Sequence, residues 1–573
     1  MTRVAIFGGG MGGLSAAHEL IERGFEVDLY EKRAAYGGKA RTYGVPGTGT
    51  AGRFDLPAEH GFRFFPGFYK HVPDSMSRIP AAEGNGRTVA DALVQCTMGE
   101  FLLPEKKATI FPVRFPRSWA EFKARLADLR NRGGLGLQQG ELSHFAWIMF
   151  RLAVSCQERR MQEWERIAWW AYTGAATRSE AYQNLLARGL TRSLVAMRAE
   201  NASTRTVGDI MLQMVYSTLT PGASSDRVLN GPTSMVWIDP WRAMLAAKGV
   251  RFHSETALEG LAIGADRRIS GATVRATGGE ARTVTADHYV CAIPVDQFTP
   301  MAKGAVAEAA PSLRALDQLQ VQWMNGVQFY LARDYPMVFG HSIFAASHWS
   351  LTSISQPQFW ANGAFPMSRF GDGRVHGLLS VDISDWTKAG QYTTTESADR
   401  LPREAIIRES WAQVQHHVAQ SGFGPLDDAD LLHAHLDTDI GHPAHGTRHA
   451  ATLRRRMTVG EHGEATATVA ADTHEPLDTD TEPLLVNTVD SWKHRPEATT
   501  GIPNLFLASD YVRTYTDLAT MEGANEAGRR AVNGILAATS SRAPQCGVWN
   551  LDEPWILAPF RAIDWVLFRL GQR

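Results

Sequence analysis

The chain has 573 residues, a formal net charge of -2 and 44% hydrophobic residues. This length exceeds what one compact core accommodates and allows two or three interleaved domains. The near-neutral charge differs from the strongly basic balance typical of nucleic-acid-binding proteins, so we expect no nucleic-acid partner.

The four cysteines stand far apart without a CxxC pair, which indicates neither a zinc site nor a disulfide framework. We therefore predict no metal ligands. The sequence reaches its first predicted strand, residues 4–7, almost at once. We expect no signal peptide and a cytoplasmic location.

The first predicted strand leads into a glycine-rich turn and then a helix. Gly8, Gly10 and Gly13 form the pattern G-x-G-x-x-G, with Met11 and Gly12 between them. Glycines permit the tight turn and let backbone N–H groups approach a pyrophosphate at the start of the helix. The pattern predicts a dinucleotide site.

A second predicted strand, residues 27–30, ends at an acid and is followed by another glycine turn. Glu31 stands at the spacing from the first turn that a ribose-binding acid takes, and Lys32 follows it. The next turn supplies Gly37, Gly38, Lys39 and Arg41. A domain that binds only a nicotinamide dinucleotide has no need of this second turn, so the pair of turns favours FAD.

The run Gly-Gly-Lys-Ala-Arg at residues 37–41 resembles a signature of the flavin amine oxidase and phytoene desaturase superfamily. The resemblance implies FAD as the cofactor. It also implies a cofactor domain built from separate chain segments, with a second domain interleaved.

Residues 54–69 resemble the stretch that lies beside the flavin in plant- and cyanobacterial-type phytoene and ζ-carotene desaturases. Its polar side chains His60, Glu59 and Arg63 are candidate catalytic residues, because each could move a proton or stabilise charge. Each could equally be a fixed structural partner. The candidate wall of an apolar substrate channel consists of Phe62, Phe64, Phe65 and Tyr69.

From about residue 118 to residue 200 the pattern is helical. An aromatic cluster in this section includes Trp169 and Trp170, which could line the same channel. Packing of these large aromatics into the core is the favoured alternative.

Residues 250–294 return to short strands, and residues 323–380 read as sheet. By resemblance, Ala257 and Leu258 lie at the adenine end of the cofactor. Five histidines follow, and an exposed polar loop is the favoured interpretation over a metal site: His433, His435, His442, His445 and His449.

The segment 504–538 reads as a strand, a loop and a helix, and it resembles the closing FAD motif of the superfamily. The resemblance implies that Asp510 meets the ribityl and pyrophosphate region and that Met521 and Glu522 present backbone at the flavin ring. Lys493 is the nearest counterpart of the lysine that amine oxidases place over the flavin, although we expect it to face solvent.

These features predict an α/β fold with three parts: an FAD-binding Rossmann-like domain (ββα/βαβ), an interleaved mixed-sheet substrate domain and a helical subdomain. The predicted cofactor domain takes residues 1–80, 226–300 and 485–540. The predicted substrate domain takes residues 81–225, which include the helical part, and residues 301–484. Residues 541–573 form an amphipathic extension.

The expected function is an FAD-dependent oxidoreductase that desaturates an isoprenoid- or carotenoid-like lipid, with a quinone or oxygen as electron acceptor. An amine oxidase of the same fold is the first alternative. A redox-neutral flavin isomerase or dehydroxylase acting on a polyene or triterpenoid is the second. A non-catalytic FAD-bound scaffold is disfavoured, because both cofactor motifs are complete.

The C-terminal extension carries apolar residues at helical spacing, together with arginines. Such a helix can lie in a bilayer interface or dock on protein, and the sequence leaves both open. Peripheral contact with the inner face of a membrane is therefore a second expectation for location.

Overall fold

The structure is a computed structural model of the chain. It describes residues 2–82, 84, 86–116, 121, 136–189, 191–192, 197–221, 223–360, 365–441, 452–459, 465–469 and 479–572. Much of the first part of the predicted helical section, residues 118–120 and 122–135, lies outside the described residues, as do His442, His445 and His449.

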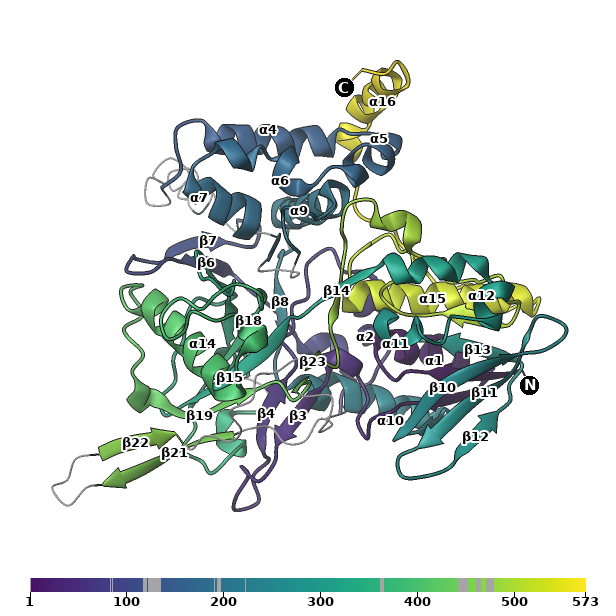
Figure 1. The fold of residues 1–573 in the computed structure, drawn as a ribbon, viewed down its shortest axis with the longest axis horizontal. Helices are drawn as coiled ribbons and strands as arrows, with labels where there is room; N and C mark the ends of the chain where they lie inside the picture. The colour runs from purple at the N-terminus through teal and green to yellow at the C-terminus, as the bar shows by residue number, and fades with distance from the viewer. Residues whose placement is uncertain are drawn as a thin grey trace.

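A five-stranded parallel sheet carries the glycine turn, with the strand order β25-β13-β1-β2-β9 (Figure 1). Its strands come from three distant parts of the chain: β1 (Arg3–Phe7), β2 (Glu26–Tyr30), β9 (Arg251–His253), β13 (His288–Cys291) and β25 (Leu505–Leu507). Residues of β1 and β13 are almost wholly buried, which explains why they read as continuous apolar runs.

Two helices pack side by side on this sheet, α1 (Met11–Ile21) and α15 (Met521–Ala538). Glycines let their backbones approach closely. A Cβ at Gly12 would lie 1.6 Å from the carbonyl oxygen of Ala508, and one at Gly528 would lie 2.7 Å from that of Gly12. The start of α15 therefore reaches the start of α1.

Smaller elements flank this sheet. An antiparallel ribbon consists of β10 (Thr256–Ile263), β11 (Ile269–Ala276) and β12 (Ala281–Val284). The pair β3 (Thr42–Val45) and β4 (Leu56–Glu59) leads to α2 (His71–Ser77). Three further helices are α10 (Asp239–Ala247), α11 (Val295–Phe298) and α12 (Ala305–Ala309).

A nine-stranded mixed sheet forms the second large body, in the order β22-β21-β19-β15-β18-β17-β16-β6-β7. Its bounds are β6 (Met98–Leu102), β7 (Thr109–Pro112), β15 (Asn325–Leu331), β16 (Ser342–Phe344), β17 (Thr352–Ser355), β18 (Gly377–Ile383), β19 (Leu431–Leu436), β21 (Thr452–Val459) and β22 (Ala465–Val469). The helix α14 (Arg403–Val418) packs against β19. The sheet predicted for residues 323–380 is present.

Three two-stranded pairs complete the strand list. They are β5 (Leu93–Gln95) with β8 (Arg227–Leu229), β14 (Gln320–Gln322) with β24 (Leu484–Val486), and β20 (Ile440–Gly441) with β23 (Thr479–Asp480).

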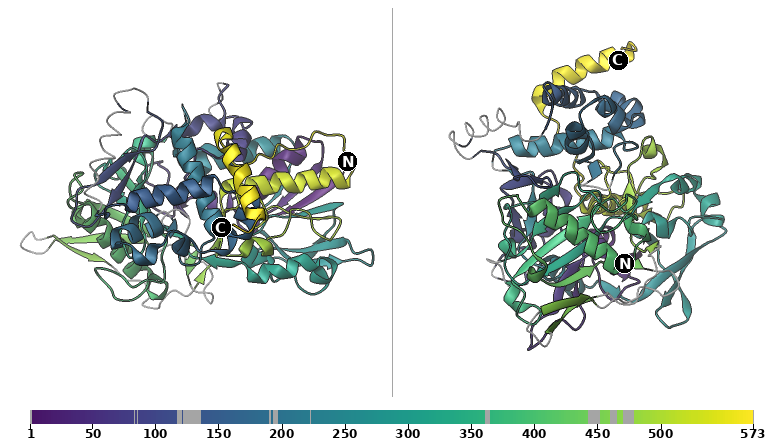
Figure 2. Two further views of the ribbon diagram at one scale, coloured as in Figure 1. Left: turned by 90° about the horizontal axis from the view of Figure 1, so that it is seen from above. Right: turned by 60° about the vertical axis from the view of Figure 1, so that its left-hand side comes forward.

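A helical layer lies over both sheets, and the C-terminal helix projects from its outer edge (Figures 1 and 2). Its helices are α4 (Glu141–Ala153), α5 (Gln157–Gln162), α6 (Trp169–Tyr172), α7 (Glu180–Tyr182), α9 (Thr204–Leu219) and α16 (Ala558–Arg569). Among the described residues, no helix has the length and apolar character needed to cross a membrane.

Candidate functional site

One elongated cavity lies where the five-stranded sheet, the nine-stranded sheet and the helical layer meet. Predicted cofactor residues form one part of its lining: Gly8, Gly10, Met11, Gly12, Glu31, Lys32, Gly37, Gly38, Lys39, Ala257, Leu258, Asp510 and Met521. Aromatic, aliphatic and a few ionisable side chains form the rest: His60, Phe62, Arg63, Phe64, Tyr69, Ile210, Met214, Met301, Met324 and Asp382.

The two glycine turns face each other across a narrow gap. A Cβ at Gly38 would lie 3.1 Å from the Cα of Gly10, and the Gly37 N–H donates to the Gly9 carbonyl at 2.8 Å. The first turn of α1 contains no acidic residue, and the first N–H groups of a helix have no partner within it. Backbone N–H donors at the positive end of the helix thus lie beside the cavity at the two glycine turns. This arrangement fits a pyrophosphate.

Glu31 is held in place at the end of β2. Its Oε2 accepts from the Gly9 N–H at 2.7 Å, and its Oε1 accepts from the Arg33 N–H at 2.9 Å. The carboxylate therefore links the first glycine turn to the strand end while lining the cavity. This position fits contact with a ribose hydroxyl.

At the other end of the cradle, Asp510 follows β25 and lines the cavity. Buried Arg495 fixes the loop that carries Asp510, because its guanidinium donates to the carbonyl oxygens of Asp510, Tyr511 and Val512. The sequence analysis named Lys493 in this segment. Lys493 is exposed and pairs with Asp490, so Arg495 is the residue that braces the site.

Three predicted cofactor residues lie outside the cavity lining: Gly13, Arg41 and Glu522. A Cβ at Gly13 would lie 1.9 Å from the Gly8 carbonyl oxygen, so this glycine serves helix–turn packing. The Glu522 carboxylate accepts the backbone N–H groups of His71 and Val72 at 2.7 and 2.8 Å. Its side chain anchors the start of α2 and points away from the cavity.

Arg41 belongs instead to a buried charge network beside the cavity. Its Nη2 lies 2.9 Å from Asp439, and its Nη1 lies 3.5 Å from Glu482. Arg33 pairs with the same two acids. The network joins the second glycine turn to the segment that follows β19. No local pattern predicts it, because its partners lie far apart in the sequence.

His60 is the one predicted catalytic residue with a strong electrostatic partner. Its Nδ1 lies 2.6 Å from Oδ2 of Asp437, which also accepts from the Asn325 side chain at 2.9 Å. Burial lowers the pKa of His60, but the Asp437 carboxylate more than offsets this, so the pKa is raised overall. The structure therefore favours a protonated imidazole at the cavity wall.

Asp382 is an ionisable cavity residue that no sequence motif indicated. It lies on β18, and burial raises the pKa of its carboxyl to about 7, with the Phe62 N–H as a hydrogen-bond donor. Its Oδ1 has no hydrogen-bond partner among the described residues. A Cβ at Gly61 would lie 2.9 Å from this oxygen, so the glycine leaves space for the carboxyl.

Glu59 does not line the cavity, which corrects its assignment as a candidate catalytic residue. Its Oε1 accepts from the Thr42 hydroxyl at 2.5 Å and from the Thr233 N–H at 3.1 Å. These contacts make it a fixed structural partner. Arg63 does line the cavity, with its Nε 3.8 Å from Oε2 of Glu59.

The predicted aromatic wall is present in part. Phe62, Phe64 and Tyr69 line the cavity, whereas Phe65 is fully buried against Trp237 with 5.5 Å between ring centroids.

The two tryptophans of the helical section lie outside the lining, which corrects their assignment to the channel. Trp169 is fully buried in the core, and Trp170 stacks beneath Arg188. The alternative of core packing describes Trp169. From the helical layer, Ile210 and Met214 of α9 line the cavity.

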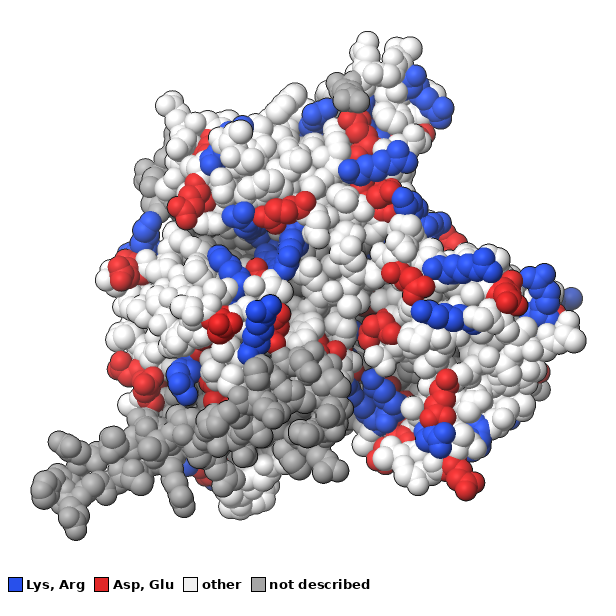
Figure 3. Space-filling model, in the orientation of Figure 1, with Lys and Arg blue, Asp and Glu red and all other residues white. Residues whose placement is uncertain are grey.

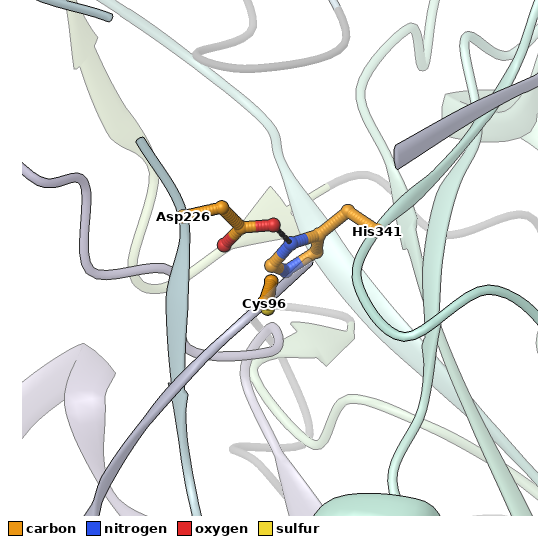
Figure 4. Close-up of side chains that lie close together, drawn as sticks. All are labelled: Cys96, Asp226 and His341. Atoms are coloured by element: carbon orange, nitrogen blue, oxygen red, sulfur yellow. Dashed lines mark hydrogen bonds and ion pairs between the residues drawn. The ribbon is translucent and has the colours of Figure 1, made fainter. Parts of the chain in front are cut away.

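A cluster of three side chains, drawn in Figure 4, contacts two of the wall aromatics through His341. His341 Nδ1 is 2.7 Å from Oδ2 of Asp226, and Cys96 lies beside them. The His341 ring is 4.7 Å from Phe62 and 5.2 Å from Phe64 between centroids. Burial raises the pKa of the Cys96 thiol, which favours its neutral form. The cluster thus consists of a thiol beside the His341–Asp226 pair, and it packs against the aromatic wall through His341.

Two of the five clustered histidines lie in the described part of the chain, on strand β19 rather than in an exposed loop. His435 is buried, its Nε2 lies 3.3 Å from the Tyr43 hydroxyl oxygen, and burial lowers its pKa to about 3. His433 pairs with Tyr330 in the β-ladder. The loop expectation was wrong for these two, because both lie on a strand that pairs with β15 inside the nine-stranded sheet.

Comparison with known proteins supports the dinucleotide site. Residues 6–79 match the family of NAD(P)-binding Rossmann-like domains. The ζ-carotene desaturase of Synechocystis sp. is 37% identical over 81 residues, which are 14% of this chain and 15% of that protein. The carotenoid φ-ring synthase of Chlorobaculum tepidum is 38% identical over 68 residues, 12% of this chain and 10% of that protein. The similarity thus spans a small part of each relative.

The fold extends the similarity over nearly the whole chain. Putrescine oxidase bound to putrescine shares it with a TM-score of 0.57 and 13% identity, covering 94% of this chain and 99% of that one. Cyclohexylamine oxidase from Brevibacterium oxydans has a TM-score of 0.55 and 13% identity over the same shares. The N-terminal sequence is thus similar to that of carotenoid desaturases, and the fold is similar to that of these two amine oxidases.

Proposed function

We propose that the chain is an FAD-dependent oxidoreductase that desaturates a lipophilic, isoprenoid-like substrate. The observation that carries the proposal is the composition of the cavity that contains the glycine turns. A dinucleotide cradle at one end continues into a section walled by aromatic and aliphatic side chains, among them Phe64, Ile210 and Met324. Such a wall suits an apolar chain better than a charged molecule.

The residues around the cavity fit the chemistry of desaturation. Desaturation removes a hydride from one carbon and a proton from its neighbour, and a bound flavin supplies the hydride acceptor. The proton needs a separate acceptor. Asp382, which lines the cavity and has a pKa of about 7, is the group we assign to that role.

The neighbouring cations have a distinct role in this proposal. His60, whose protonated form the Asp437 carboxylate favours, and Arg63 can place positive charge on the cavity wall. Positive charge stabilises negative charge that develops on a neighbouring cofactor or substrate. A quinone or oxygen would then reoxidise the cofactor.

An amine oxidase is the second candidate, favoured by the solved structures that share the fold over 94% of this chain. If the protein is an amine oxidase, the Asp382 carboxylate would pair with a cationic amine. The same experiment separates the two candidates.

The purified protein should be yellow, and the flavin it releases should be FAD. Under anaerobic conditions a panel of polyprenes should bleach the flavin absorbance, and mass spectrometry should find a product lighter by two hydrogens. Bleaching by amines alone would establish the oxidase instead. A changed polyprene of unchanged mass, with oxidised flavin, would indicate an isomerase, and a colourless protein would refute FAD binding.

A further inference from the structure

The C-terminal helix α16 docks on the helical layer through its polar side. Its Asp564 accepts from the side chain of Arg159 at 3.0 Å and from the backbone N–H of Cys156 at 2.8 Å. Arg561 pairs with Glu553 at 2.9 Å. This side of the helix covers a second cavity that is lined largely by charged groups, including Arg160 and Asp209. A surface helix of a globular protein normally buries its apolar stripe instead.

The apolar side of α16 faces away from the body as a result. Trp555, just before the helix, is 85% exposed, Ile563 is 57% exposed and Leu570 is 69% exposed. Exposed Phe560 also belongs to this side. The view in Figure 2 (right) shows the helix at the outer edge of the helical layer, where no other part of the drawn chain covers it.

The outer side of α4 continues this apolar surface. Trp147 is 61% exposed, and Phe150, also exposed, lies 6.2 Å from Phe560 between ring centroids. In Figure 3, uncharged side chains cover most of the surface over α4. We call the exposed apolar side chains of α4, residues 555–557 and α16 the outer apolar face. Contiguous apolar patches of this kind mark sites of association.

The helices of the outer apolar face expose positive charge, and the neighbouring acid Glu158 accepts from the Trp565 ring nitrogen at 2.8 Å. The acids of α4 and α16, Glu141 and Asp564, point inward and are engaged by Ser179 and Arg159. Arg569, exposed, stacks on Trp565 at 5.4 Å, and Arg151 lies over Trp164. Among the described residues of these two helices, the exposed charged side chain is therefore that of Arg569.

From this arrangement we propose that the outer apolar face binds the surface of an anionic lipid bilayer, with α16 lying in the interface. Exposed tryptophans suit the headgroup region, aliphatic side chains enter the acyl boundary, and arginines meet anionic headgroups. The helix α9, which packs against α4, contributes Ile210 and Met214 to the main cavity, so the bound bilayer would lie on the side of the helical layer opposite that cavity. The proposal does not depend on the reaction at the flavin.

The test is flotation of the full-length, flavin-loaded protein with two kinds of vesicle, phosphatidylcholine alone and phosphatidylcholine mixed with phosphatidylglycerol. The wild-type protein should float with the anionic vesicles, and added salt should weaken the binding. The triple variant Trp555→Glu, Ile563→Glu, Leu570→Glu should bind at least about tenfold more weakly. Because all three side chains are exposed, its flavin content and melting temperature should match those of the wild type.

The matched control is the double variant Ile110→Glu, Val321→Glu, which adds charge at exposed apolar positions on β7 and β14. It should bind the vesicles as the wild type does. Failure of the wild-type protein to float, or unchanged binding by the triple variant, would overturn the proposal. So would a wild-type dimer in solution that the triple substitution converts to monomer, because the face would then join two copies of the chain.

Discussion

His60 and Asp437 form a buried pair at the cavity wall, with 2.6 Å between the imidazole Nδ1 and the carboxylate Oδ2. Burial by itself would raise the pKa of Asp437, but His60 lowers it well below its usual range, while Asp437 raises the pKa of His60. Each residue therefore keeps the other charged. The pair joins the end of β4 to the end of β19 in the nine-stranded sheet.

The first prediction concerns the stability of this pair. Asp437→Asn removes the nearest counter-charge of buried His60 and leaves only the more distant Asp439, at 3.9 Å, so we expect a loss of about 3 kcal/mol in the free energy of unfolding near neutral pH. Chemical denaturation followed by fluorescence measures the loss. A loss below about 1 kcal/mol would mean that the pair is solvated, as surface pairs are.

The pH dependence of the same pair has a defined sign. The raised pKa of His60 adds stability that is fully present below the unfolded pKa of about 6.5 and is lost as the pH rises through the folded value. The lowered pKa of Asp437 adds stability that is lost as the pH falls through its folded value. Wild-type stability should thus decline on the alkaline side, and His60→Gln should reduce that decline.

The second prediction separates the two roles of glycine in the first turn. A Cβ at Gly10 has Gly38 Cα, 3.8 Å away, as its nearest neighbour, and the backbone φ of -79° suits any residue. Gly10→Ala should fold normally but hold less flavin, because the methyl group enters the space of the pyrophosphate. Gly12→Ala should lose stability as well, because its Cβ would lie 1.6 Å from the Ala508 carbonyl oxygen.

Flavin absorbance per protein and thermal melting of the flavin-free protein measure these effects. Gly24→Ala is a useful contrast, since Gly24 has a φ of +79° and no atom within 4 Å of a built Cβ. It should lower stability modestly and leave flavin content unchanged. Equal flavin content in the wild type and in Gly10→Ala would place the pyrophosphate elsewhere.

The third prediction tests Asp382 as the proton acceptor. Asp382→Asn should lower kcat by about 100- to 10,000-fold, since a positioned base contributes that much to a rate. In the wild type, kcat/KM should rise with pH through about 7 as the carboxyl loses its proton. The variant should lose this pH dependence while retaining flavin.

The stability of Asp382→Asn provides the control. A carboxyl whose pKa is raised on folding makes the protein less stable as the pH rises from the unfolded pKa of that carboxyl to its folded pKa. The uncharged amide avoids this loss, so the variant should be at least as stable as the wild type above pH 7. Unchanged kcat and an unchanged pH profile would remove Asp382 from the mechanism.

The fourth prediction concerns Glu522, which lies outside the cavity lining. Its carboxylate accepts the N–H groups of Lys70, His71 and Val72 and so joins the start of α15 to the start of α2. Glu522→Gln should lower stability by about 1–3 kcal/mol, because one of these buried donors loses its charged acceptor. The midpoint of thermal unfolding should fall, whereas the turnover of protein saturated with flavin should stay near the wild-type value.

Several features could be predicted from the sequence because they depend on neighbouring residues. The strand, glycine turn, helix and second strand at residues 3–30 follow from local pattern and from the conformations that glycine allows. The closing strand and helix around Asp510 follow in the same way. A dinucleotide site was therefore predictable, and so was the apolar stripe of the C-terminal helix.

Other features were decided by the tertiary structure alone. Asp382 reaches the cavity because β18 pairs with β15 in the nine-stranded sheet, and Asp437 reaches His60 because β19 borders β15 on its other edge. No local pattern encodes such pairings. Tertiary packing also determined that Trp169 is buried in the core. It determined as well the orientation of α16, whose apolar side points outward because its polar side contacts Arg159. Periodicity along a helix gives the stripe, and only the packing of neighbouring elements determines which side of it is exposed.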